Sequence, residues 1–76
     1  MRHVYENIEL IREARGISQT RMAEDSKVPV MMMHRWLTGQ SKLPADAMKP
    51  IAKSLLVSDI DIFFDDELTD SVTQSH

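Results

Sequence analysis

The fold of this chain is indicated by residues 18–39, which read SQTRMAEDSKVPVMMMHRWLTG. Ser18 predicts the start of a helix, because its hydroxyl can accept a hydrogen bond from a backbone N–H of the first turn. Residues 26–28 follow as a short connection, and Pro29 suits the first turn of a second helix, where its missing N–H would have had no partner. Gly39 is expected to end that helix. The stretch therefore predicts two short helices joined by a tight turn.

The second of these helices is expected to have two different faces. At 100° per residue, one side collects apolar residues that should face the core, namely Val30, Met33, Trp36 and Leu37. The other side carries Met31, His34, Arg35 and Thr38. Trp36 could instead offer a surface on which nucleic-acid bases stack, but its place on the apolar side favours a structural role in the core.

Three further helices are expected around this pair. Residues 5–15 place Ile8 and Ile11 on one face and are followed by a glycine that can end a helix. Residues 45–56 should begin with a loose turn and become regular from about Lys49, because Pro50 would break a hydrogen bond deep inside a helix.

A brief fifth helix is expected over residues 58–64. Ser58 and Asp61 have the spacing of a capping box, with aspartate in place of the usual glutamate. Phe63 is expected in the core, whereas Phe64 is left open between core and a dimer seam. Strand signals are scarce, so the fold class is expected to be all-α, a compact bundle of five short helices.

Composition limits what the chain can be. Seventy-six residues make one small domain, and 42% apolar with 28% charged residues should let it fold. The absence of cysteine excludes disulfides and a zinc-finger ligand set. The longest apolar run is far too short to span a bilayer, and the N-terminus lacks the layout of a secretory signal. We expect a cytoplasmic protein with no membrane partner.

Charge is distributed unevenly along the chain. Residues 1–58 hold all nine basic side chains and six acidic ones, a net charge of +3. Residues 59–76 hold six acidic side chains and no basic ones, which brings the total to −3. We expect one domain over residues 1–64 and an unordered acidic tail over residues 65–76.

Several short pieces occur in an order and spacing that together are quite specific. They are Ile11-Arg12, Arg15-Gly16-Ile17-Ser18-Gln19, Met22-Ala23-Glu24, Arg35-Trp36, Gly39, Ile51-Ala52-Lys53-Ser54-Leu55 and Val57-Ser58. Over about residues 8–64 the chain resembles the Xre/Cro family of helix-turn-helix repressors, which includes lambdoid phage repressors. The resemblance implies a five-helix lambda-repressor-like domain whose third helix lies in the major groove of double-stranded DNA.

The resemblance also implies which residues contact DNA. Base edges would be read from the third helix, by Val30, Met31, Met32, His34 and Arg35. Arg35 is the strongest candidate because its guanidinium can donate two hydrogen bonds to a guanine, although it could be only a solvated charge. Phosphates would be contacted by polar or basic residues at the second helix and after the third, namely Ser18, Gln19, Thr38, Gln40, Ser41 and Lys42. Gln19 could orient toward both phosphate and the recognition helix.

Four features depart from the family pattern. Lys27 stands where the turn usually has glycine and must adopt a positive φ or reshape the turn. Pro29 replaces a hydroxyl residue that would cap the helix and touch phosphate, which puts that contact in doubt. Leu37 replaces a glutamate that often pairs with the arginine at Arg12, so Arg12 needs another partner or stays solvated. The positions of Pro44 and Pro50 can give the loop before the fourth helix its own shape.

The sequence thus predicts a repressor that binds an inverted repeat as a homodimer, with no enzymatic activity, cofactor or metal site. The three histidines, His3, His34 and His76, are far apart and have no cysteine beside them, and Asp65, Asp66 and Glu67 lie in the tail without a pocket. A protein-binding module is the alternative, such as an anti-repressor or antitoxin. It would dock through the apolar start of the third helix, at Val30, Met31 and Met32, or through the acidic tail.

Overall fold

The computed structural model describes residues 3–64 of the chain, and this part forms four α-helices. They are α1 (Val4–Ala14), α2 (Gln19–Ser26), α3 (Val30–Leu37) and α4 (Met48–Ser54). Two short 3₁₀ helices, Ala45–Ala47 and Ile60–Phe64, precede and follow α4. Residues 3–64 contain no strand, so the all-α prediction is confirmed. The acidic segment 65–76, predicted to be an unordered tail beyond a domain of residues 1–64, lies outside the described residues.

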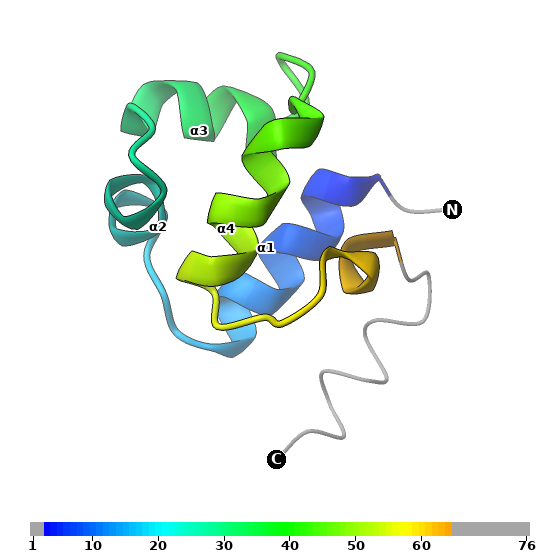
Figure 1. The fold of residues 1–76 in the computed structure, drawn as a ribbon. Coiled ribbons are helices and arrows are strands. Elements are labelled where there is room, and N and C mark those ends of the chain that lie inside the picture. The colour runs from blue at the N-terminus through cyan, green and yellow to red at the C-terminus, as the bar shows by residue number, and fades with distance from the viewer. Residues whose placement is uncertain (1–2, 65–76) are drawn as a thin grey trace.

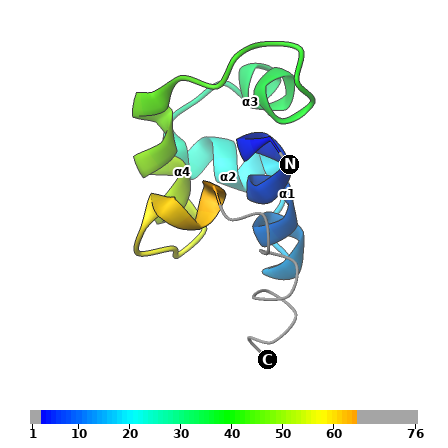
Figure 2. The same ribbon diagram turned by 90° about the vertical axis from the view of Figure 1, so that its right-hand side faces the viewer.

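The helices pack around one core. In Figure 1, α4 crosses in front of α1 and α3 lies across the top of the molecule, while the 3₁₀ helix Ile60–Phe64 lies beside α1. Figure 2 shows α3 again at one edge, well away from that 3₁₀ helix. The fully buried side chains come from every α-helix and from Phe63, and the largest of them are Ile8, Ile11, Met22, Met33, Ile51 and Leu55. One face of α3 is therefore free of the core.

The first half of the chain follows the sequence prediction with small shifts at the helix ends. The Ser18 hydroxyl accepts the Arg21 N–H at 3.0 Å and caps α2 as predicted, but α2 continues through Ser26, which had been placed in the connection. Pro29 was predicted inside the first turn of α3, and this is wrong, because its ψ of 136° is extended. Its carbonyl accepts the Met33 N–H at 3.0 Å, so Pro29 stands immediately before the helix.

The second half differs more. The loose turn before α4 is confirmed as the 3₁₀ helix Ala45–Ala47, and Pro50 is tolerated as the third residue of α4, where an N–H would have no partner within the helix. The helix ends at Ser54, two residues earlier than predicted, because Leu56 takes a left-handed φ of 61°. The predicted fifth helix is a single 3₁₀ segment. Asp59 stands immediately before it, and the Asp59 carboxylate accepts the Asp61 N–H at 3.0 Å, whereas Ser58 does not cap the segment.

Two contacts tie the ends of the fold to α1. The buried Asn7 side chain donates to the Phe63 carbonyl at 2.6 Å, across 56 residues of sequence. Gly39 lies over Tyr5, and an added Cβ would sit 2.9 Å from the Tyr5 hydroxyl. The φ of +80° at Gly39 also favours glycine, so this residue lets the segment after α3 lie directly on α1. Within residues 3–64, no helix is both long enough and apolar enough to cross a membrane.

The connection between α2 and α3 depends on one strained residue. Lys27 has φ 60° and ψ 41°, as expected for the position that usually holds glycine. Its N–H donates to the Glu24 carbonyl at 3.1 Å, and the Val28 N–H donates to the Ala23 carbonyl at 2.9 Å, so two of the last four carbonyls of α2 are satisfied by the turn. The chain reverses within three residues and enters α3 at once.

Asn7→Ala should lower the free energy of unfolding by about 1–3 kcal/mol, because it removes a donor from the buried Phe63 carbonyl. Ser26→Ala is the matched control. The Ser26 hydroxyl is buried without a hydrogen-bond partner among the described residues, so its removal should leave stability unchanged or raise it. Urea denaturation followed by circular dichroism measures both; equal losses from the two variants would contradict this account of the Asn7 contact.

Lys27→Gly should raise the free energy of unfolding by about 0.5–1 kcal/mol. A left-handed conformation costs a lysine about 1–2 kcal/mol, and glycine avoids this cost, but the greater freedom of glycine in the unfolded chain offsets part of the gain. Thermal unfolding of the variant measures the change. Arg15→Gly serves as the comparison, because Arg15 follows α1 with an ordinary φ of −94° and its replacement should not stabilise the protein.

Candidate functional site

The outward face of α3 is the most distinctive surface of the molecule. Met33, Trp36 and Leu37 are buried, as predicted, so the residues between them point to solvent. Val30 was expected on the core side and is 43% exposed, because it is the first residue of α3 and lies at the edge of the core. Met31 and Met32 are 72% and 47% exposed, which confirms that both lie outside the core.

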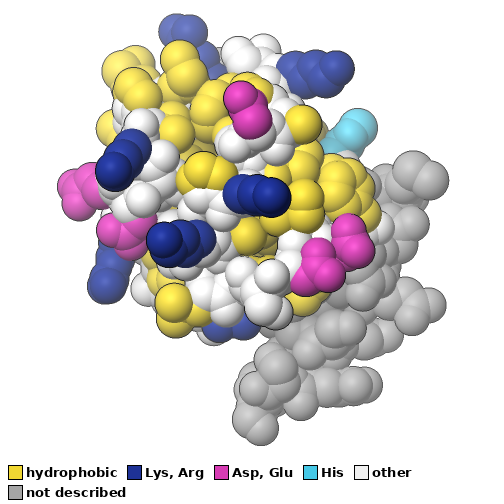
Figure 3. Space-filling view, in the orientation of Figure 1, with side chains coloured by type: hydrophobic (Ala, Val, Ile, Leu, Met, Phe, Trp, Pro, Cys, Tyr) yellow, Lys and Arg dark blue, Asp and Glu magenta, His cyan; other side chains and the backbone are white. Residues whose placement is uncertain are grey.

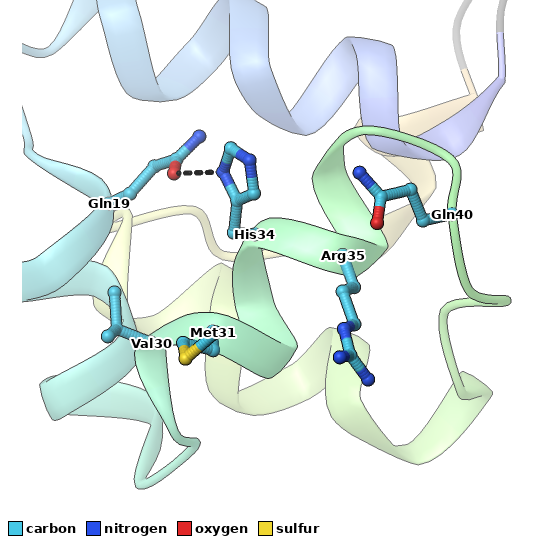
Figure 4. Close-up of a pocket in the computed structure, with 6 residues that line it drawn as sticks. All are labelled: Gln19, Val30, Met31, His34, Arg35 and Gln40. Atoms are coloured by element: carbon cyan, nitrogen blue, oxygen red, sulfur yellow. Dashed lines mark hydrogen bonds between the residues drawn. The ribbon is translucent and has the colours of Figure 1, made fainter.

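An open hollow of about 370 Å³ lies along this face. It is lined by Gln19 from α2, by Val30, Met31, His34 and Arg35 from α3, and by Gln40 from the following loop. Figure 4 shows that Gln19 and His34 point toward each other, whereas Arg35 extends away from them. Apolar groups therefore lie at the start of α3 and polar groups farther along it. The structure brings together four of the five predicted base-reading residues, and Met32 lies outside the hollow.

A chain of hydrogen bonds begins behind the hollow. Arg12 contacts the Glu9 carboxylate through Nε and Nη2, each 2.6 Å from Oε2. The other oxygen of that carboxylate, Oε1, accepts a hydrogen bond from Nε2 of Gln19 at 2.6 Å. Oε1 of Gln19 in turn lies 3.2 Å from Nδ1 of His34. Three helices are thus linked through side chains, from α1 through α2 to α3.

This chain also settles where Arg12 finds its partners. Nη1 of Arg12 donates to the Ile17 carbonyl at 2.8 Å, so the guanidinium bridges the end of α1 and the segment that leads into α2. Glu9, three residues earlier in the same helix, supplies the carboxylate. A partner after Trp36 is therefore not needed, and Leu37 is free to enter the core.

The predicted phosphate-contacting residues are not equally available. The Thr38 hydroxyl donates to the His34 carbonyl at 2.9 Å, and the Ser18 hydroxyl caps α2. The backbone N–H groups of Gln40 and Ser41 both donate to the Arg35 carbonyl, at 2.9 and 3.2 Å. These groups mainly complete the helix ends. Lys42 and the Gln40 side chain remain exposed, and neither takes part in an ion pair or a side-chain hydrogen bond within residues 3–64.

Arg35 is similarly unengaged. Its side chain is exposed and belongs to none of the ion pairs among residues 3–64, which involve Arg12 and Arg21. A guanidinium at the edge of this hollow can donate several directed hydrogen bonds to an acceptor-rich partner. Within the same residues, no group of three His, Cys, Asp or Glu side chains could hold a metal ion.

A second hollow, of about 720 Å³, was not anticipated from the sequence. Arg15, Arg21 and Lys53 line it together with Asp25 and the exposed Leu56, and Arg21 lies 3.8 Å from Asp25. These residues belong to separate segments, so only the packing of α2 on α4 brings them together. On the face drawn in Figure 3, the basic side chains are spread among apolar and acidic ones and do not form one continuous patch.

No protein-family model matches this chain, and no curated protein or solved structure matches it either. The chemistry of the α3 surface and of the hollow beside it therefore carries the functional inference.

Proposed function

We propose that the chain is a sequence-specific regulator of transcription that binds double-stranded DNA through a helix-turn-helix, with α2 as the supporting helix and α3 as the recognition helix. The observation that carries this proposal is the unengaged Arg35 on the outward face of α3, beside the polar groups of Gln19, His34 and Gln40. Base edges in the major groove present acceptors and donors that such side chains can pair with.

The dimensions of α3 suit this role. A helix with its side chains is about 10–12 Å in diameter, and the major groove is about 12 Å wide, so α3 can enter it with its outward face toward the bases. The buried side chains Met33 and Trp36 anchor α3 in the core. Ala23, a small residue of α2, allows α2 and α3 to approach closely. The likeness to Xre/Cro repressors points the same way.

The residues of α3 would divide the work of recognition. Arg35 can donate two hydrogen bonds to O6 and N7 of a guanine, worth about 1–3 kcal/mol of discrimination. Val30, Met31 and Met32 carry no donors or acceptors suited to base edges, so they would contact thymine methyl groups. Lys42 would supply attraction to phosphate that does not depend on sequence, while Thr38, Ser18 and the loop backbone complete the helix ends.

The protein would act as a repressor that binds an inverted repeat as a homodimer. The two recognition helices would then lie about 34 Å apart on one face of the duplex. Exposed apolar side chains support a dimer seam in the C-terminal part of the domain: Leu56 is 78% exposed and Phe64 is 55% exposed. Both residues lie outside α3, so a seam formed by them would not use the outward face of that helix. Such a protein would act in the cytoplasm of a bacterial cell or a phage-infected host.

Arg35→Ala should reduce the preference for the selected operator over scrambled duplexes by about 5- to 150-fold, the value of a bidentate guanine contact. Lys42→Ala should weaken binding to both duplexes alike and lower the slope of affinity against salt by about one. Fluorescence anisotropy at several salt concentrations measures both, on duplexes enriched from a random pool. Identical profiles for the two variants would overturn this division of roles.

A protein-binding module is the second candidate, because Met31 is 72% exposed and adjoins the exposed Val30 and Met32. Methionine adapts to irregular apolar partners, so this surface suits an anti-repressor or antitoxin. Failure of the random pool to yield any enriched sequence, with only weak and salt-labile binding, would favour this candidate.

Removal of residues after Phe64 should strengthen DNA binding by the proposed repressor. The removed segment carries four carboxylates and no basic side chain, so it repels phosphate or competes for the basic side chains of the domain. Anisotropy titrations of the two forms on one duplex measure the change. Unchanged affinity would show that the segment is no electrostatic brake, and loss of all binding would favour the protein-binding candidate.

A further inference from the structure

A chain of hydrogen bonds runs from Arg12 through Glu9 and Gln19 to His34. From it we infer that Gln19 is a positioning residue, not a phosphate contact, and that it makes His34 a reader of the exocyclic amino groups of adenine or cytosine. The base-reading part of this inference rests on the proposed function, whereas the part that concerns the His34 ring does not.

The first step is the orientation of the Gln19 amide. Its nearest partner on one side is the Glu9 carboxylate, at 2.6 Å, and an ionised carboxylate only accepts hydrogen bonds. The amide must therefore turn its NH₂ group toward Glu9. Arg12 holds that carboxylate in place through its other oxygen, also at 2.6 Å. The Gln19 oxygen is left facing His34.

The second step is the position of the proton on His34. Oε1 of Gln19 can only accept, and it lies 3.2 Å from Nδ1 of the ring, so Nδ1 must carry the hydrogen. In a neutral imidazole the other nitrogen is then an acceptor. Figure 4 shows the ring at the hollow with Nδ1 turned to Gln19. His34 is exposed, so Nε2 presents a hydrogen-bond acceptor to whatever enters the hollow.

The third step is what this acceptor can read. In the major groove only two base groups donate: the N6 amino group of adenine and the N4 amino group of cytosine. Guanine and thymine present acceptors at the corresponding place, which would leave Nε2 facing another lone pair. On the strand that His34 approaches, the ring therefore favours adenine or cytosine over guanine or thymine. Arg35, the next residue of α3, has the opposite preference because it only donates.

The ring can be tested first, in the free protein. Long-range ¹H–¹⁵N spectra of the full chain, recorded above the titration range of histidine, should show the His34 proton on Nδ1. In Gln19→Ala, the proton should move largely to Nε2, the form that histidine side chains prefer in water. Thr20→Ala is the matched control, because Thr20 is the exposed residue next to Gln19 in α2 and lies outside the chain of hydrogen bonds, and it should leave the proton on Nδ1. A wild-type ring protonated on Nε2 would overturn the inference, whatever the protein binds.

The base preference is tested on duplexes selected from a random pool by each variant. Wild-type protein and Thr20→Ala should share one position where adenine or cytosine is favoured roughly fivefold, the value of one net hydrogen bond. Gln19→Ala should lose or reverse that preference and keep the guanine preference assigned to Arg35. Specific binding with the same base preferences in all three proteins would overturn the base-reading step and leave the proposed function intact. No enriched sequence from wild type, despite a proton on Nδ1, would overturn the base-reading step together with the proposed function.

Discussion

The burial of one side of α3 is the constraint on which the rest of the structure depends. Met33, Trp36 and Leu37 pack into a core that a chain of this size can only just provide. Because a helix repeats every 3.6 residues, burying these three side chains forces His34 and Arg35 outward. Exposure of His34 and Arg35 is thus a direct consequence of core packing, and a loss of that packing would rotate or release the outward face of α3.

A second layer of interactions refines what this packing establishes. The buried pair of Met22 and Ala23 holds α2 against the rest of the core, and the αL turn at Lys27 leads directly into α3. The polar chain through Glu9 and Gln19 then connects α1, α2 and α3 on the solvent side of the same contact. Core packing sets the direction of α3, and the polar chain sets the orientation of individual groups on its surface. This division explains why so small a domain can present a defined hydrogen-bonding pattern.

Apolar and polar groups on α3 support the two proposed functions unequally. Exposed methionines suit either a protein partner or thymine methyl groups, so they do not separate the two. Directed polar groups do separate them, since an amide and an imidazole held by hydrogen bonds and an unengaged guanidinium are useful where a partner offers acceptors and donors at fixed spacing. The regular edges of base pairs are such a partner, which is why DNA recognition takes precedence.

Much of the fold was predictable from the sequence, because the signals are local. The cap at Ser18, the loose turn before α4 and the buried face of α3 were each inferred from neighbouring residues, and all are present. The positive φ at Lys27 was expected only from the resemblance to the family, and it too is present. Helix ends were less predictable. The early end of α4, the exposure of Val30 and the 3₁₀ form of residues 60–64 depend on competition between local preference and the packing of distant elements.

By itself the sequence determined that the chain is helical and which side chains α3 displays, because periodicity and caps act over a few residues. Only the tertiary structure decided which hydrogen-bond partners those side chains have. Glu9, Gln19 and His34 come from three helices, and no spacing in the sequence indicates that a carboxylate behind α2 orients an amide against a ring on α3. Hydrogen bonds are effective only over about 3 Å and at particular angles, so this relation exists only once the core has placed the helices side by side.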